Sequence, residues 1–126
     1  MAAEKKDIKV ALIKVENWQR ALLLNVSSVR DAIRCLNDVA LKIVIVVDAN
    51  DSVLGTITDG DVRRALLRGE SLDVPIERIM NSDFLALPGT ATSNEALEIM
   101  REKVLQHIPV LNDQGQLVHL FLLEDL

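Results

Sequence analysis

The stretch that decides the fold is VIVVDANDSVLGTITDGDVRR, residues 44–64. Its first four residues are all β-branched, which is typical of a strand buried on both faces. The turn-forming residues DANDS at 48–52 indicate a hairpin. The return strand over 53–58 leads into a helix that we expect to run to Arg68. This order predicts a unit of strand, hairpin, strand and helix.

The same pattern occurs twice, 64 residues apart, so that Asp125 matches Asp61. Residues 27–62 match residues 91–126 by residue class without a gap, although few of the paired residues are identical. Each copy opens with a hydroxyl residue, an acid three positions later and an apolar stripe, which predicts a capped helix. We also expect a first strand in each copy, near 20–24 and near 84–87, so that each copy reads strand, helix, strand, hairpin, strand, helix.

One copy alone, with about fifty residues, buries too little apolar surface to offset its chain entropy. The two copies must therefore pack face to face, and we predict an α+β pseudo-dimer with a cleft where the two sheets meet. The expected division is an N-terminal extension over 1–17, a first copy over 18–69, a connector over 70–80 and a second copy over 81–126, whose last helix is truncated.

Composition excludes several classes of function. The 126 residues carry a formal charge of −5 and only 2% aromatic residues, which argues against a nucleic-acid partner. No signal peptide or membrane span is evident, and a single cysteine, Cys35, forms no internal disulfide, so we expect a cytoplasmic protein. The two histidines have no partners at zinc spacing, and we expect no metal site.

These strands and turns, together with HIPVL at 107–111, resemble the cystathionine β-synthase (CBS) domain pair, or Bateman module, from about Trp18 onward. The resemblance implies a tandem β-α-β-β-α repeat and a regulatory, non-catalytic role. TDGDVRR at 58–64 and LLEDL at 122–126 further resemble the CBS pair that precedes the catalytic domain of bacterial sugar-phosphate nucleotidyltransferases. This closer resemblance implies that the chain is a regulatory fragment of such a transferase.

The family's Thr-x-x-Asp pattern, which holds the ribose of an adenine nucleotide, is matched by Thr58 and Asp61. An Asp in the first helical turn stays ionised beside the positive end of the helix dipole and can accept hydrogen bonds from both ribose hydroxyls. The alternative, which is compatible with this role, is that these residues only cap the helix. In the second copy Asp125 is present but Leu122 replaces the Thr, so we expect at most one good ribose site.

Phosphate groups need cations near the cleft. In the family a basic residue just before the buried strand often reaches phosphate, and Lys42 and His107 occupy that place in the two copies. Arg63 and Arg64 are further candidates. The alternative for each is a solvated or half-buried polar side chain, and Arg64 also has the spacing to pair with Asp61.

The adenine face would be formed by Val44, Ile45 and Ile108, which belong to the core under any interpretation. We expect no catalytic residue and no required cofactor, because no nucleophile stands beside a base and no Gly-rich phosphate loop is present.

Two functions remain open. The first is a sensor whose ligand is an adenine nucleotide such as AMP, ADP or ATP and which gives allosteric regulation of the attached nucleotidyltransferase. The second is a structural module with an empty cleft, which forms a homodimer through apolar helix faces such as Ala65, Leu66 and Leu67.

Overall fold

The computed structural model describes residues 18–126, and the expected extension over 1–17 lies outside the described residues. The first half of this part contains the elements η1 Trp18–Ala21, β1 Leu22–Leu24, α2 Val29–Asp38, β2 Val44–Val47, β3 Val53–Ile57 and α3 Asp59–Leu67. A connector with the short 3-10 helix η2, Ile76–Arg78, leads to the second half. That half contains β4 Leu87–Pro88, α4 Ser93–Lys103, β5 His107–Leu111, β6 Leu117–Leu122 and η3 Leu123–Asp125.

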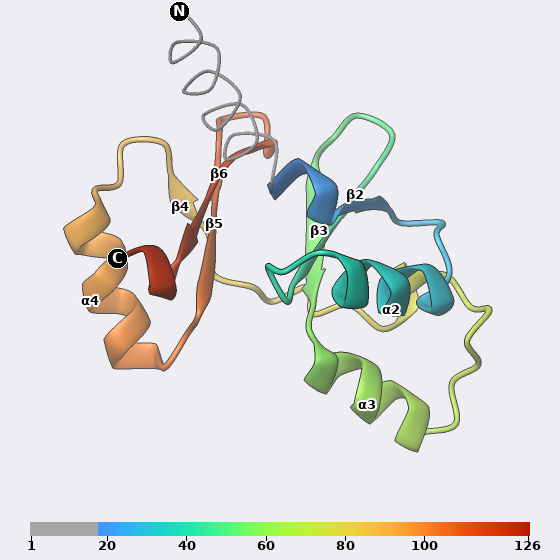
Figure 1. Ribbon diagram of the computed structural model, residues 1–126. Coiled ribbons are helices and arrows are strands. Elements are labelled where there is room, and N and C mark those ends of the chain that lie inside the picture. Colours follow the sequence, from blue (N-terminus) through green and yellow to red (C-terminus); the bar gives the residue numbers. More distant parts are fainter. Residues whose placement is uncertain (1–17) are drawn as a thin grey trace, which may run out of the picture.

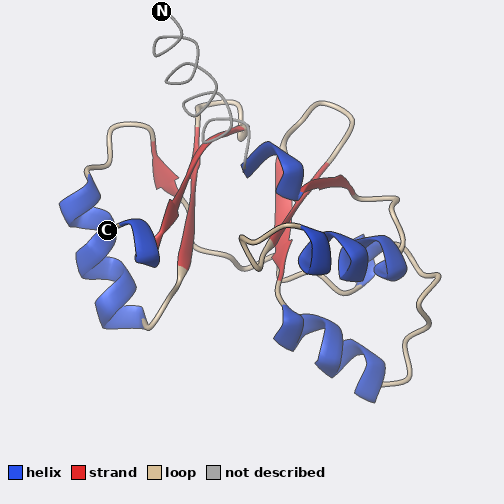
Figure 2. Ribbon diagram, in the orientation of Figure 1, coloured by secondary structure: helices blue, strands red, loops and turns tan. Residues whose placement is uncertain are grey.

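Each half folds around a three-stranded sheet, in the order β1-β2-β3 or β4-β5-β6. In each sheet the first strand runs parallel to the middle strand and the last runs antiparallel to it. The two sheets face each other in the middle of the molecule, and the helices α2, α3 and α4 lie on the outside (Figures 1 and 2). The predicted α+β pseudo-dimer is therefore confirmed.

The register of the sheets repeats with the predicted spacing. Leu23 pairs with Val46 in the first sheet, and Leu87 pairs with Val110 in the second. Both members of the second pair lie 64 residues beyond their counterparts in the first. The middle strands also carry an irregularity in register at equivalent places, after Val46 and after Val110. The duplication that was inferred from residue classes is thus present in the backbone.

The two hairpins use the same local chemistry. The Oδ1 atom of Asp48 accepts hydrogen bonds from the backbone N–H groups two and four residues later, over 2.8 and 3.0 Å. The Oδ1 atom of Asn112 accepts the equivalent two bonds, each over 2.9 Å. A left-handed residue then closes each turn, Asp51 at φ 63° and Gly115 at φ 77°. The turn predicted at 48–52 is confirmed, and its short Asx side chain explains why the chain reverses there.

Hydroxyl caps start the first helix of each half, as predicted. The Oγ atom of Ser28 accepts from the Asp31 backbone N–H over 3.1 Å, and the Asp31 carboxylate accepts from the Ser28 backbone N–H over 3.1 Å. Thr92 caps α4 through the backbone N–H of Glu95 at 3.1 Å. These bonds satisfy N–H groups that a helix leaves without partners at its start.

The expected first strands are only partly correct. The chain over Trp18–Ala21 winds into a 3-10 helix, so β1 begins at Leu22 rather than near residue 20. The first strand of the second copy, expected near 84–87, is the short strand β4 and is confined to Leu87–Pro88. Pro88 has no N–H to donate to a neighbouring strand, which limits how far pairing extends there.

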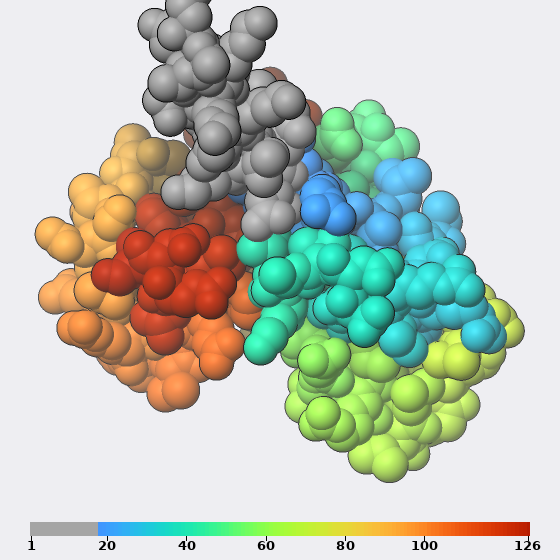
Figure 3. All heavy atoms as spheres, viewed as in Figure 1, coloured from blue at the N-terminus to red at the C-terminus, as the bar shows by residue number. Residues whose placement is uncertain are grey.

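The core joins the two halves. Leu117 and Leu120 of β6 are buried in the same cluster as the apolar residues of the first half. Ser52 pairs with Gln116, its own counterpart in the repeat, and the Val53 N–H donates to the Gly115 carbonyl oxygen over 2.8 Å. The pseudo-twofold axis therefore passes beside these two hairpins. The space-filling view shows atoms of the two halves in contact in the middle of the molecule (Figure 3).

Candidate functional site

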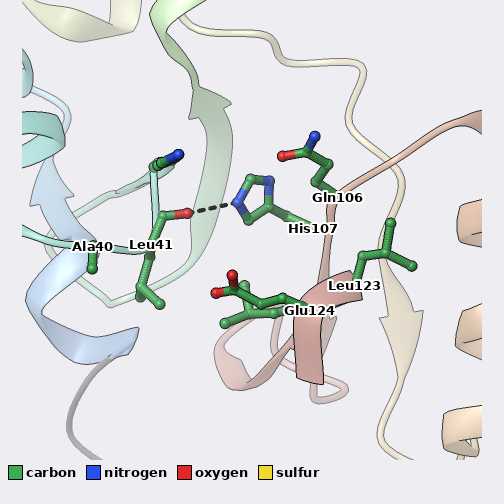
Figure 4. A pocket seen from close by; sticks show the side chains of 8 residues that line it. Ala40, Leu41, Gln106, His107, Leu123 and Glu124 are labelled. Atoms are coloured by element: carbon green, nitrogen blue, oxygen red, sulfur yellow. Dashed lines mark hydrogen bonds between the residues drawn. The ribbon is translucent and has the colours of Figure 1, made fainter. Parts of the chain in front are cut away.

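A hollow of about 290 Å³ opens where the two halves meet. Its walls come from the loop before β2, the start of β5 and the end of β6 (Figure 4). The lining residues are Ala40, Leu41, Lys42, Gln106, His107, Leu122, Leu123 and Glu124. Because Lys42 and Gln106 are equivalent positions of the repeat, the hollow lies close to the pseudo-twofold axis and contains chemistry from both copies.

A hydrogen bond crosses the hollow from one half to the other. The Nε2 atom of His107 donates to the carbonyl oxygen of Leu41 over 2.6 Å (Figure 4). Since a carbonyl oxygen only accepts, this contact requires the proton on Nε2. Leu41 itself is 5% exposed, so the bond also satisfies an acceptor in a largely buried residue.

The environment of His107 keeps its imidazole neutral. Burial lowers the pKa of His107 below its ordinary value of 6.5. The hydrogen bond to Leu41 and the negative charge of Glu124 oppose this shift without cancelling it. At neutral pH the ring is therefore a neutral donor and adds no positive charge to the hollow.

Lys42 lies in the wall next to this bond and has an uncommon backbone conformation. Its φ is 61°, in the left-handed region that costs a residue with a Cβ some free energy. It stands between Leu41, whose carbonyl meets His107, and Ile43, which is buried. The left-handed backbone at Lys42 thus lies between the Leu41 carbonyl, which faces the second half, and the buried residues that lead into β2. Such strain often accompanies a functional site.

Glu124 contributes the negative charge of the hollow. It belongs to η3, and this turn is fixed against β5 by the Leu123 N–H, which donates to the Gln106 carbonyl oxygen over 2.9 Å. In Figure 4 its side chain lies beside the bond between His107 and Leu41. Glu124 is not among the residues predicted from the sequence. The sequence offers one sign that Glu124 differs between the repeats, because the residue that matches it in the first repeat is the uncharged Gly60.

The structure brings only two of the predicted site residues, Lys42 and His107, into the lining of this hollow. Asp61 is bonded within its own helix: its Oδ2 atom accepts from the Thr58 N–H over 2.9 Å and from the Thr58 Oγ1 over 3.1 Å, and its Oδ1 accepts from Arg64 over 2.8 Å. The helix-start contacts that were the alternative for Thr58 and Asp61 are therefore present. Their role in holding a ribose stays a prediction.

The remaining predicted residues lie in other places. Arg63 is exposed on α3, and Asp125 is exposed in η3 next to Glu124 without lining the hollow. Val44, Ile45 and Ile108 are fully buried strand residues. They form core, as expected under any interpretation, and their contact with an adenine stays a prediction.

Other kinds of site find no support in the part of the chain that the structure describes. Over residues 18–126 no group of three or more His, Cys, Asp or Glu side chains is placed to hold a metal ion. Within the same range no helix has the length and apolar character needed to cross a membrane. The thiol of Cys35 is buried, donates to the Arg20 carbonyl oxygen over 3.5 Å and has a pKa raised by that burial.

The family model of the CBS domain matches residues 26–68 and residues 76–126. The chain belongs to the CBS domain family. Its two halves are the two repeats of a CBS pair, as the resemblance implied, and the hollow lies at the junction of those repeats.

Among curated proteins the CBS pair is similar to the arabinose 5-phosphate isomerase GutQ of Escherichia coli K12. The two are 33% identical over 99 residues, which is 79% of this chain and 31% of the isomerase. The chain thus spans about a third of the length of the GutQ isomerases that it matches.

Solved structures show the same fold. A CBS domain protein of Pyrobaculum aerophilum, complexed with AMP, superposes with a TM-score of 0.73 at 23% identity, over 83% of this chain and 81% of that one. The CBS domain pair of protein MJ0100, in complex with 5′-methylthioadenosine and S-adenosyl-L-methionine, gives a TM-score of 0.71 at 21% identity, over 82% of each chain. These similarities confirm the tandem CBS architecture.

Proposed function

We propose that this CBS pair is a regulatory module that binds an adenine-containing nucleotide in the hollow between its repeats. The observation that carries the proposal is the composition of the walls, which come from equivalent loops of both repeats and are joined by the bond between His107 and Leu41. A ligand that contacts both walls favours one packing of the repeats over others. Coupling of this kind is typically about 1–3 kcal/mol.

The chemistry of the walls fits such a ligand. Leu122 and Leu123 offer apolar surface for a flat base, while Gln106 offers an amide that both donates and accepts. Lys42 supplies a cation for a phosphoryl group. The two solved CBS structures named above contain AMP or adenosyl compounds, which supports an adenine nucleoside as the common part of the ligand.

The ribose contact has two candidate locations. The family pattern favours Thr58 and Asp61, but a ribose there has to displace Arg64 from the Asp61 carboxylate or share it. The other location is the end of β6, where Glu124 lines the hollow and Asp125 follows it. Variants of Asp61 and Asp125 separate the two locations in the binding experiment below.

The regulated partner is proposed to be an enzyme that acts on sugar phosphates. The sequence resemblance favours an attached nucleotidyltransferase, which stays a prediction, whereas the curated relative named above is a sugar-phosphate isomerase. The two enzymes catalyse different reactions, but each acts on a sugar phosphate. The CBS pair itself is proposed to have no catalytic role, and its cytoplasmic location stays a prediction.

Calorimetric titration and thermal unfolding with AMP, ADP and ATP test the proposal. Ligand at about a hundred times its dissociation constant stabilises the folded state by roughly 2.7 kcal/mol. Lys42→Gln is expected to weaken AMP binding about tenfold, while Lys103→Gln, at the exposed end of α4, leaves it unchanged. Absence of heat and of any thermal shift at millimolar nucleotide contradicts the proposal.

One observation favours a second function, assembly into a homodimer. Leu66 and Leu67 on α3 are 42% and 82% exposed, which is unusual for large apolar side chains next to each other. Ala65 does not belong to this face, because it is fully buried against its own core. If the dimer uses this face, sedimentation experiments show a dimer for wild type and a monomer for Leu67→Gln. Nucleotide binding is retained in the variant.

A further inference from the structure

We infer that the hollow selects adenine nucleosides and nucleoside monophosphates over di- and triphosphates, and that Glu124 is the residue that sets this selection. The inference deepens the proposed function and rests on it. It concerns a side chain outside the Thr-x-x-Asp pattern, at a position where the first repeat has Gly60.

The lining of the hollow has few charged side chains. Three of its eight residues are titratable: Lys42, His107 and Glu124. The imidazole is neutral at pH 7, because burial lowers the pKa of His107. One cation and one anion therefore remain, and the lining has a net charge close to zero. Lys42 can balance one phosphoryl group, and each further group meets no additional cation in this wall.

The backbone that carries Glu124 is held at the wall of the hollow, so its exposed side chain stays close to the site. The backbone bond from Leu123 to Gln106 fixes the turn that carries it against β5. Its carboxylate is near enough to His107 to affect that ring, and it forms no ion pair with any of residues 18–126. In Figure 4 the Glu124 side chain lies near the bond between His107 and Leu41.

A polyphosphate has to approach this carboxylate or leave the hollow for solvent. Like charges repel over several ångströms, and the side chain's exposure reduces the effect by screening without removing it. The chain's formal charge of −5 acts in the same direction. The volume of about 290 Å³ is at the low end for ligand sites, which also favours a short 5′ substituent.

Calorimetric titration of adenosine, AMP, ADP and ATP into the whole chain, at 0.15 M salt and with EDTA, tests the inference. Wild type is expected to bind AMP at least tenfold more tightly than ATP. Glu124→Gln is expected to reduce this ratio to threefold or less, mainly through tighter ATP binding. Glu102→Gln, an exposed glutamate of α4 outside the hollow, serves as the matched control and keeps the wild-type ratio.

The outcomes distinguish a failure of the AMP-over-ATP selection from a failure of nucleotide binding itself. ATP binding as tight as AMP binding in wild type, or an unchanged ratio in Glu124→Gln, overturns the selection while the nucleotide-binding function stands. Absence of binding by all four ligands at millimolar concentration overturns the proposed function and the selection with it. Far-ultraviolet circular dichroism of each variant confirms that it is folded before titration.

Discussion

His107 of the second repeat donates a hydrogen bond to the carbonyl oxygen of Leu41 in the first repeat, over 2.6 Å. The repeat provides no equivalent of this bond, because the position that matches His107 is Ile43, whose side chain has no donor. The pseudo-twofold symmetry of the backbone is thus broken by the side chains at the junction. The hollow beside this bond therefore differs chemically from the surface that the pseudo-twofold axis relates to it.

His107→Ala removes this bond and leaves the Leu41 carbonyl without its partner. A buried acceptor that loses its hydrogen bond costs about 1–3 kcal/mol, so urea unfolding is expected to show a loss in that range. His107→Gln keeps an N–H donor on a side chain of similar reach and recovers part of the loss. Equal stability of His107→Ala and wild type contradicts a structural role for the bond.

The unfolding free energy is expected to fall between pH 8 and pH 5.5. The pKa of His107 is lower in the folded state than the 6.5 of the unfolded chain, so the unfolded state binds a proton first as the pH falls. Stability therefore decreases below about pH 6.5 until the folded-state pKa is passed. Urea unfolding at several pH values checks this, and the unfolding free energy of His107→Gln is expected to depend less on pH than that of wild type.

Local features of the fold could be predicted from the sequence because short-range contacts determine them. The cap formed by Ser28 and Asp31 and the turn that begins at Asp48 depend on side chains within four residues of each other. The first strands were less accurate, since their ends depend on pairing with distant segments.

The candidate site was predicted only in part for the same reason. Lys42 and His107 follow from their places next to the start of the buried middle strand in the first and the second repeat. Glu124 reaches the hollow because η3 is bonded to Gln106 and because the first repeat packs against β6, and neither contact leaves a pattern in neighbouring residues.

Gly55→Ala is expected to destabilise the fold by about 1–3 kcal/mol. A Cβ at Gly55 would lie 2.8 Å from the Asn81 carbonyl oxygen and 2.8 Å from the Met80 side chain, where the connector pairs with β3. Gly89→Ala is the matched control, because a Cβ there meets no atom within 4 Å. Thermal unfolding checks both variants, and equal melting temperatures contradict the packing of the connector against β3.

Val104→Gly is expected to stabilise the protein by roughly 1 kcal/mol. Val104 ends α4 at φ 56° and ψ 51°, a left-handed conformation that is unfavourable for a β-branched side chain, and it is 88% exposed. Glycine adopts this conformation without the steric cost and loses little buried surface. Urea unfolding measures the change, and a loss of stability would show that the valine is not strained there.

Asp61→Asn is expected to lower stability by about 1 kcal/mol, because the carboxylate accepts hydrogen bonds from Thr58 and pairs with Arg64 at the start of α3. Its effect on AMP affinity tests the family's ribose position. A tenfold loss of affinity supports Asp61 as a ribose ligand, and unchanged affinity with a tenfold loss in Asp125→Asn places the ribose at the end of β6. Calorimetry on the folded variants measures both affinities.

Backbone amide shifts of the ¹⁵N-labelled chain during a titration with AMP test most directly whether nucleotide binds between the repeats. We expect saturable shifts that are largest at Lys42, His107 and Glu124, which line the hollow from both halves. A spectrum that does not change at millimolar AMP, or one whose largest shifts lie away from the junction of the two repeats, contradicts nucleotide binding there.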